Sequence, residues 1–169
     1  MTTEAEDLNG VNVAATAAFQ DAVRANPARA DRNPTVVARW LDGGRSEVSC
    51  DGAVATIGGD DELNPMRMLL GTLAACDVDL VAMHAALLGV RLEGLEVEAQ
   101  GYFNVQRYMG LEAPIGSGYQ SVRYVVRVNA PTATEEQLSR LRELCERGSP
   151  VGDTLERAIP LTLSFEAGP

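Results

Sequence analysis

The sequence predicts an α+β fold in which antiparallel sheets wrap around a long central helix. Residues 64–90, NPMRMLLGTLAACDVDLVAMHAALLGV, are almost wholly apolar and begin with an Asn-Pro pair typical of a helix start. A helix this apolar has to be buried against other parts of the protein. The segments on both sides of it alternate apolar and polar residues, as half-exposed strands do. Strands grouped apart from the helices in this way indicate α+β.

An additional helix is expected near the amino terminus. Residues 11–26 are rich in alanine, and an apolar stripe recurs at helical spacing: Val11, Ala15, Ala18, Phe19, Ala22 and Val23. The Asn-Pro pair that follows marks its end. We interpret residues 1–33 as a helical extension that docks by one weak face.

Strands are expected before the central helix. The segment 34–59 carries β-branched residues on both sides of Gly43 and Gly44, which predicts a hairpin. Asp51 and Gly52 predict a second tight turn. A polar loop then leads into the central helix.

The chain beyond the central helix alternates strands and helices. The central helix is expected to end near Gly89, because glycine is the usual residue just past a helix end. Thr134 and Gln137 have the spacing of a capping box, which predicts the start of another helix. In order, we expect a strand over 92–104, an exposed loop over 105–118, a strand over 119–130, a helix over 134–148, a short helix over 149–159 and a closing strand over 160–166.

Composition excludes several classes of function. The chain has 169 residues and a formal net charge of −10, so no basic surface is available for nucleic acid or for an anionic membrane. The acidic amino terminus does not resemble a secretory signal. Three cysteines at no regular spacing do not form a secreted disulfide framework, and a reducing cytoplasm fits them best.

The central helix is long enough to span a bilayer, but its charges argue against that. Arg67, Asp77, Asp79 and His84 interrupt it, and such residues are costly in lipid. So few strands cannot cover a helix this apolar within one chain. We therefore expect an obligate homodimer, with part of the helix at the interface.

Cys76, near the middle of the central helix, is the leading candidate for chemistry. A reactive thiol needs a positive neighbour, and the two aspartates that follow Cys76 are unfavourable, so an arginine from elsewhere would have to supply the activation. From the residues alone, a buried structural cysteine is the favoured interpretation. Cys50 and Cys145 are expected to be structural, and His84, the single histidine, cannot build a zinc site. We expect no metal and no cofactor.

Two segments resemble the OsmC/Ohr family of osmotically induced and organic hydroperoxide resistance proteins. They are NPMRMLLGTLAAC, at the start of the central helix, and the later SPVGDTL, in the family's order and spacing. The resemblance runs over residues 36–166, so we divide the chain into the extension and an OsmC-like domain over 34–169. It implies an intertwined homodimer whose sheets wrap two central helices. It also implies thiol-dependent reduction of organic hydroperoxides, with an external dithiol of the lipoyl type as reductant.

The resemblance assigns roles to residues and also shows departures. Cys76 takes the position of the peroxidatic thiol, and Arg45 matches the activating arginine. Where the family usually has a second cysteine, this chain has Ser149, and Cys145 lies one helical turn earlier as a candidate replacement. The family's glutamate directly after Asn-Pro is replaced by Met66, which leaves Glu62 as the candidate acid (see the printed sequence).

Three functions follow as alternatives from these residues. The first is a hydroperoxide reductase that works through Cys76 with an external thiol or with Cys145. The second is a dimer that no longer reduces peroxides but binds an apolar small molecule in the same pocket, with methionines as a soft lining. The third is a folded dimer whose family site has decayed.

Overall fold

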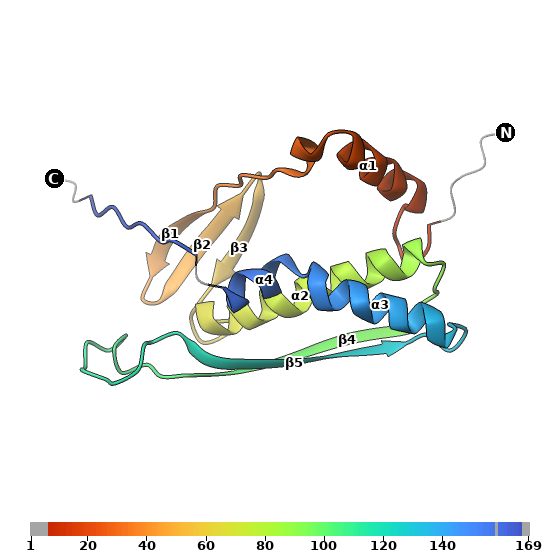
Figure 1. Ribbon diagram of the computed structural model, residues 1–169. Helices are drawn as coiled ribbons and strands as arrows, with labels where there is room; N and C mark the ends of the chain where they lie inside the picture. The colour runs from red at the N-terminus through yellow and green to blue at the C-terminus, as the bar shows by residue number, and fades with distance from the viewer. Residues whose placement is uncertain (1–6, 158, 167–169) are drawn as a thin grey trace.

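The computed structural model describes residues 7–157 and 159–166 and has the predicted α+β architecture (Figure 1). A long helix, α2, lies at the centre, and a two-stranded and a three-stranded antiparallel sheet lie on different sides of it. The elements in order are α1 (Val13–Ala25), the 3-10 helix η1 (Pro27–Ala30), β1 (Val37–Asp42), β2 (Arg45–Cys50), β3 (Ala53–Ile57), α2 (Pro65–Leu87), β4 (Gly94–Phe103), β5 (Tyr119–Asn129), α3 (Glu135–Gly148) and α4 (Pro150–Glu156).

The boundaries of α2 follow from its local sequence. The Asn64 side chain caps the helix by accepting the Arg67 N–H at 2.9 Å, and Pro65 occupies the first turn, where no N–H is needed. Gly89 directly follows the carboxyl end with φ of +70°, a conformation that favours glycine. Both predicted ends of the central helix are therefore confirmed.

The two-stranded sheet of β4 and β5 packs along one side of α2. Its strands pair antiparallel over their full length, with Val97 opposite Val126. The apolar residues of β4 face inward and its acidic residues face solvent, as the alternation predicted. The core cluster consists of Val81, Ala85, Val90 and Leu141, with half-buried residues of β4, β5 and α3 packed around them, and Leu73, Leu80 and Ala86 of α2 are buried as well.

The helix α3 closes the other side of this core. Thr134 and Gln137 form the predicted capping box, with the Thr134 hydroxyl accepting the Gln137 N–H at 3.2 Å. Leu141 is the residue of α3 that is fully buried. Ser149 then ends α3 and caps α4, where its hydroxyl accepts the Gly152 N–H at 3.1 Å.

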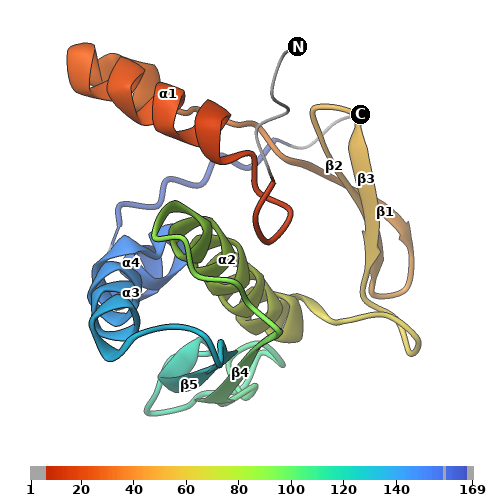
Figure 2. The same ribbon diagram turned by 90° about the vertical axis from the view of Figure 1, so that its right-hand side faces the viewer.

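The three-stranded sheet stands apart from this core, beside the amino end of α2 (Figure 2). Its order is β1–β2–β3, with the predicted turns at both ends of β2. Every residue of β1 is exposed, and Trp40 is 75% exposed. Within one chain this sheet therefore has no core to cover.

Two details differ from the predictions. Residues 160–166 were expected to form a closing strand, but in this single chain they pair with no other strand, and Leu161, Leu163 and Phe165 are 91%, 88% and 88% exposed. A strand needs a partner for its hydrogen bonds, and none lies beside this segment. The helix α1 is confirmed, and its predicted stripe is right in part: Ala22 and Val23 are half-buried, whereas Ala15, Ala18 and Phe19 are exposed.

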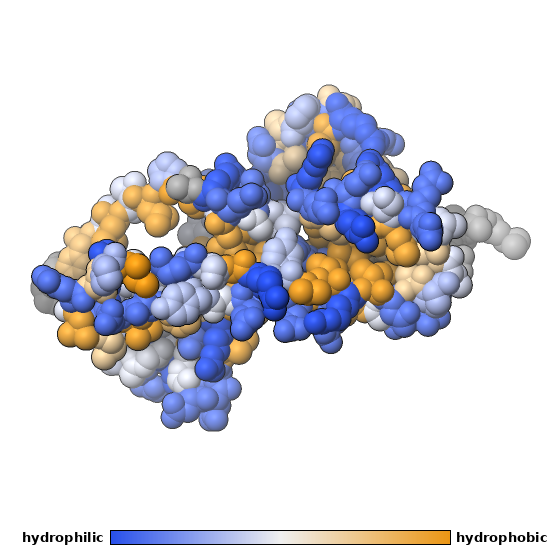
Figure 3. Space-filling view, turned by 60° about the horizontal axis from the view of Figure 1, so that its bottom comes forward, coloured by the Kyte–Doolittle hydropathy of each residue, from blue (hydrophilic) through white to orange (hydrophobic). Residues whose placement is uncertain are grey.

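Apolar surface is therefore left uncovered in several places, as the orange patches among polar side chains in Figure 3 illustrate. The helix α2 is long and apolar enough to cross a membrane by length and composition. Only 28% of its most apolar window is buried within this chain. Within the described residues, however, α2 is the central helix, packed against β4, α3 and α4.

Candidate functional site

Cys76 lies in the middle of α2 and is half-buried. The next residue, Asp77, points about 100° further round the helix and is buried, with 3% of its surface exposed. Its Oδ1 has no hydrogen-bond partner among the described residues. The thiol and this carboxyl group therefore lie on different faces of one helix.

Ser149 is the side chain that meets Cys76. Its hydroxyl lies 3.9 Å from the Cys76 sulfur and is oriented to donate to it. The same oxygen accepts the Gly152 N–H, so the cap of α4 holds the hydroxyl in place. The position at which a second thiol was expected is thus beside Cys76, and it carries an alcohol. An alcohol can donate a hydrogen bond to sulfur but cannot form a disulfide.

A pocket of about 950 Å³ opens next to this pair, between α2, β5 and the segment that joins α3 to α4. Ser149 forms part of its wall, so a molecule in the pocket would come close to the Cys76 thiol. Tyr119 closes one side, and its hydroxyl donates to the Met66 carbonyl at 2.7 Å. The apolar part of the lining comprises Met66, Leu69, Leu73, Val122 and Leu155.

Arg45 and Glu62 come together at the amino end of α2. An Arg45 Nη2–Glu62 Oε1 distance of 3.4 Å joins them, and Asp42 lies 3.3 Å from the other terminal nitrogen. Gly59 makes this approach feasible, because a side chain there would collide with both Arg45 and Glu62. Met66 stands where the family usually has the glutamate that pairs with the arginine. In this chain Glu62, from the loop before α2, supplies the carboxylate that contacts Arg45.

This ion pair is far from Cys76 of the same chain. Glu62 precedes the cap residue Asn64, and Cys76 lies 12 residues beyond that cap, which is about 18 Å along a helix. An arginine at the start of α2 cannot contact a thiol three turns further on. Within one chain, the structure thus brings Cys76 to Ser149 and Arg45 to Glu62, and keeps the two pairs apart.

Cys145 belongs to a different environment. It packs against the core cluster that contains Val81 and Leu141. Burial raises the pKa of the Cys145 thiol, and the nearby carboxyl groups of Asp77 and Glu146 raise it further. Cys145 is therefore a poor source of thiolate at neutral pH. All three cysteines, including Cys50 on β2, are free in this structure.

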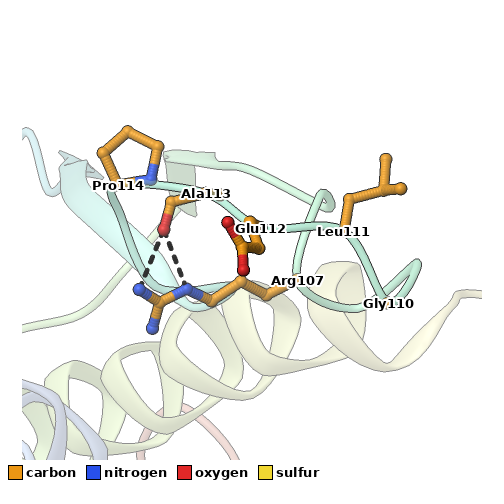
Figure 4. Close-up of a pocket in the computed structure, with 6 residues that line it drawn as sticks. All are labelled: Arg107, Gly110, Leu111, Glu112, Ala113 and Pro114. Atoms are coloured by element: carbon orange, nitrogen blue, oxygen red, sulfur yellow. Dashed lines mark hydrogen bonds between the residues drawn. The ribbon is translucent and has the colours of Figure 1, made fainter.

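A second hollow lies in the long loop between β4 and β5 (Figure 4). Arg107 holds this loop closed, because its Nε and Nη2 donate to the Ala113 carbonyl at 3.1 and 2.9 Å. Gly110, Leu111, Glu112 and Pro114 complete the lining. The hollow contains no nucleophile and no second cation, so we assign it no chemistry.

No metal centre is found in the described part of the chain. Among residues 7–157 and 159–166, no three His, Cys, Asp or Glu side chains are grouped so that they could hold an ion. His84 lies on α2, where burial and the nearby Arg140 lower its pKa.

Comparison with known proteins assigns the chain to a family. The family model described as OsmC-like protein matches residues 58–164. The chain belongs to the OsmC-like family. The match begins in the loop before α2 and includes Cys76, Ser149 and the exposed segment after α4. The division between residues 33 and 34 stays a prediction.

Solved structures agree on the fold. An OsmC-like protein from Mycoplasma pneumoniae aligns with a TM-score of 0.62 and 16% identity, over 75% of this chain and 89% of that chain. An OsmC-like protein of unknown function from Vibrio cholerae aligns at 0.57 and 12%, over 75% and 95%. An organic hydroperoxide resistance protein OsmC from Legionella pneumophila aligns at 0.51 and 12%, over 75% and 90%. No curated protein matches the chain.

Sequence reasoning missed part of the OsmC-like site. Tyr119, Tyr124 and Glu156 line the pocket, yet nothing in their local sequence marks them. The burial of Asp77 was also missed, although it lies four residues after the buried Leu73 and therefore on the same helical face. That spacing is the signal that could have found it.

Proposed function

We propose that this OsmC-like protein reduces organic hydroperoxides through Cys76 and protects against oxidative stress. The observation that carries the proposal is the half-buried Cys76 thiol beside the Ser149 hydroxyl, which forms part of the wall of a pocket with both apolar and charged lining residues. The family provides the reaction type, because some solved relatives are named organic hydroperoxide resistance proteins. A reduced thiol also fits a reducing compartment, so we place the protein in the cytoplasm.

The reaction is written for a peroxide ROOH and a dithiol reductant. The Cys76 thiolate attacks the distal peroxide oxygen, the O–O bond breaks, and the alcohol ROH leaves with a proton, so that Cys76 becomes a sulfenic acid. One thiol of the reductant then attacks this sulfur and water leaves, which gives a mixed disulfide. The second thiol of the reductant displaces Cys76 as thiolate. The peroxide is reduced by two electrons and the dithiol is oxidised to a disulfide.

Ser149 makes an external thiol the expected reductant. A serine in contact with Cys76 cannot resolve the sulfenic acid. Cys145, whose pKa is raised, offers little thiolate for the attack. We therefore propose a one-cysteine cycle, with a lipoyl-type dithiol as the external reductant.

We further propose that the active unit is a homodimer. Three apolar surfaces are uncovered in the single chain: the outer side of α2, the sheet β1–β2–β3 and the extended segment 160–166. Their combined exposure is unusual for a monomer. A dimer would also solve the separation of the two pairs, because Arg45 of the partner subunit could then face Cys76.

The enzymatic proposal is tested with purified protein, cumene hydroperoxide and dihydrolipoamide. We expect turnover that is lost in Cys76→Ser and kept in Cys50→Ser, the matched control on β2 (Cys50 is 26 positions before Cys76 in the printed sequence). Mass spectrometry after one addition of peroxide should find Cys76 oxidised. If Cys76→Ser turns over as fast as the parent, the proposal is wrong.

The dimer is tested by complementation between two inactive variants. Arg45→Ala and Cys76→Ser are each expected to lose activity. If the site combines residues of two chains, mixed dimers contain one intact site, and random mixing restores about a quarter of the parent activity in a two-fold dimer. Mixing that restores nothing would show that each chain builds its own site.

The second candidate function is binding of an apolar small molecule without peroxide reduction. The observation that favours it is the pocket itself, together with the alcohol at position 149 (Ser149). The rate of Cys76 alkylation against pH separates the two functions. The alkylation rate of a peroxidatic thiol should already have reached its plateau at neutral pH, whereas the rate for an ordinary thiol keeps rising until the pH exceeds about 8.5.

A further inference from the structure

The pocket beside Ser149 combines an apolar wall with an acidic rim. Its apolar residues come from α2, β5 and the end of α4, whereas its charged residues come from the last turn of α3 and from α4. The pocket lining contains four charged residues, three acidic and one basic: Glu146, Asp153, Glu156 and Arg147. These four residues are exposed, we call them the rim of the pocket, and together they carry more negative than positive charge.

Only part of this negative charge is neutralised. Asp153 is compensated, because Arg157 contacts its Oδ2 through Nε at 2.8 Å and Nη2 at 2.7 Å. Within residues 7–157 and 159–166, neither Glu146 nor Glu156 forms an ion pair. Among the pocket-lining residues of this chain, Arg147 is the single cationic side chain.

A buried carboxyl group, that of Asp77, lies behind the pocket wall and adds to the negative charge near the pocket. Asp77 lies one helical turn beyond Leu73, on the face of α2 that forms the pocket wall, and its Oδ1 has no partner among the described residues. Burial raises the pKa of Tyr124, and Asp77, Cys145 and Glu156 raise it further. Asp77 also raises the pKa of Cys145, which lies in the core beside α2 and not in the pocket lining. Tyr124 of β5 therefore experiences a negative potential, whereas Arg67 acts in the opposite direction on the pKa of Tyr119, at the other end of the pocket lining of β5.

We propose that this pocket accepts apolar molecules with a neutral or cationic head group and discriminates against carboxylates. The inference rests on the proposed function where it concerns peroxides. It then assigns neutral or amine-bearing apolar hydroperoxides as substrates, and it makes free fatty-acid hydroperoxides poor ones. The apolar wall supplies affinity through burial, while the acidic rim and Asp77 supply the selectivity.

The kinetic test compares two substrates that differ only in their head group. Linoleic acid hydroperoxide and its methyl ester are assayed below the concentrations at which they aggregate. We expect kcat/KM for the ester to exceed that for the acid at least about fivefold at low salt, the effect of one unit charge at roughly 8 Å in a medium between protein and water. Added salt should narrow the difference, because it screens the rim charges.

Matched variants assign the selectivity to the pocket. Glu146→Gln combined with Glu156→Gln should move the ratio of the two kcat/KM values clearly towards one, while Asp77 keeps part of the preference. The control is Glu135→Gln combined with Glu136→Gln, which removes the same charge from the first turn of α3, outside the pocket lining. If both double variants change the ratio equally, net charge and not the pocket sets the preference, and the proposal is overturned.

A binding test separates this inference from the proposed function. Decanol, decylamine and decanoate compete with a fluorescent apolar probe on the Cys76→Ser protein, which needs no turnover. We expect decanoate to bind at least about fivefold more weakly than decanol. If no peroxide is reduced but this order holds, the enzymatic proposal fails and the pocket inference stands. If decanoate binds as well as decanol, the pocket inference fails whatever the turnover.

Discussion

The contact between Cys76 and Ser149 predicts that Ser149→Cys creates a redox-sensitive cross-link. The Cys76 sulfur and the Ser149 oxygen are 3.9 Å apart, whereas a disulfide requires about 2.05 Å between sulfurs. The longer carbon–sulfur bond of the new side chain closes part of this gap, and a small movement at the start of α4 closes the rest. Peroxide should therefore convert Cys76 to a sulfenic acid that the introduced thiol resolves.

The magnitude follows from the length of chain that the cross-link closes. The two residues are 73 positions apart, for which the loss of entropy in the unfolded chain stabilises the fold by about 4 kcal/mol. Loss of the Ser149 hydroxyl as the cap of α4 costs about 1 kcal/mol. We expect the oxidised variant to be about 3 kcal/mol more stable than the parent, and the reduced variant about 1 kcal/mol less stable.

Urea denaturation of the oxidised and reduced protein measures both values, and peptide mapping identifies the linked residues. Ser149→Ala isolates the loss of the cap, and Cys76→Ser combined with Ser149→Cys removes the cross-link while keeping the new thiol. If two equivalents of peroxide leave the introduced thiol free and give Cys76 sulfinic acid, the side chains do not meet as described. The geometry on which the one-cysteine cycle rests would then be wrong.

Three further predictions concern stability. Leu141→Ala should lower the free energy of unfolding by about 2–5 kcal/mol, because it empties a fully buried site, whereas the volume-conserving Leu141→Met should cost less than about 1.5 kcal/mol in urea denaturation. Thr134→Ala should cost about 1 kcal/mol by removing the capping hydroxyl that accepts the Gln137 N–H, and Thr134→Ser should restore most of it. His84 has a folded-state pKa below its ordinary value of 6.5, so the unfolded chain binds its proton first. The His84 contribution to stability is then present above pH 6.5 and is lost as the pH falls. With His84→Gln, the urea midpoint should therefore change less between pH 7 and pH 5.5 than in the parent.

The helix boundaries could be predicted from the sequence because the residues that set them lie next to each helix end. The Asn64 cap, the Pro65 that follows it and the glycine at Gly89 define α2 without reference to the rest of the chain. The capping box at Thr134 does the same for α3. Each of these signals depends on hydrogen bonds within a few residues, which a single sequence contains.

The closing strand over 160–166 illustrates where such reasoning stops. Leu161, Leu163 and Phe165 alternate as a strand requires, and the segment is extended, but a strand also needs a neighbour that supplies hydrogen bonds. Alternation states which side chains share a face and does not state which chain covers them. The stripe of α1 was right only in part for the same reason: Ala22 and Val23 are half-buried and Phe19 is exposed, because the packing of the whole chain decides which part of an apolar stripe is covered.

The candidate site divides in the same way. The resemblance singled out Cys76, Ser149, Arg45 and Glu62, and the structure brings them together in two pairs. The distance between the pairs was not accessible from the motif, because it depends on where the hairpin before α2 packs. The pocket residues Tyr124 and Glu156 come from β5 and α4, and nothing in the sequence alone brings those elements together.

The uncovered surfaces and the divided site have one explanation under the dimer proposal. A sheet without a core, an extended apolar segment and a half-covered α2 each call for a partner. The Arg45–Glu62 pair lies at the start of α2, whereas Cys76 of the same chain lies about 18 Å along the helix from the cap residue Asn64. A second copy in two-fold symmetry would present the start of its α2 to the middle of the first, and the reciprocal contact would follow from the symmetry. Stability and chemistry would then depend on the same interface, so a substitution that weakens the dimer should reduce both together.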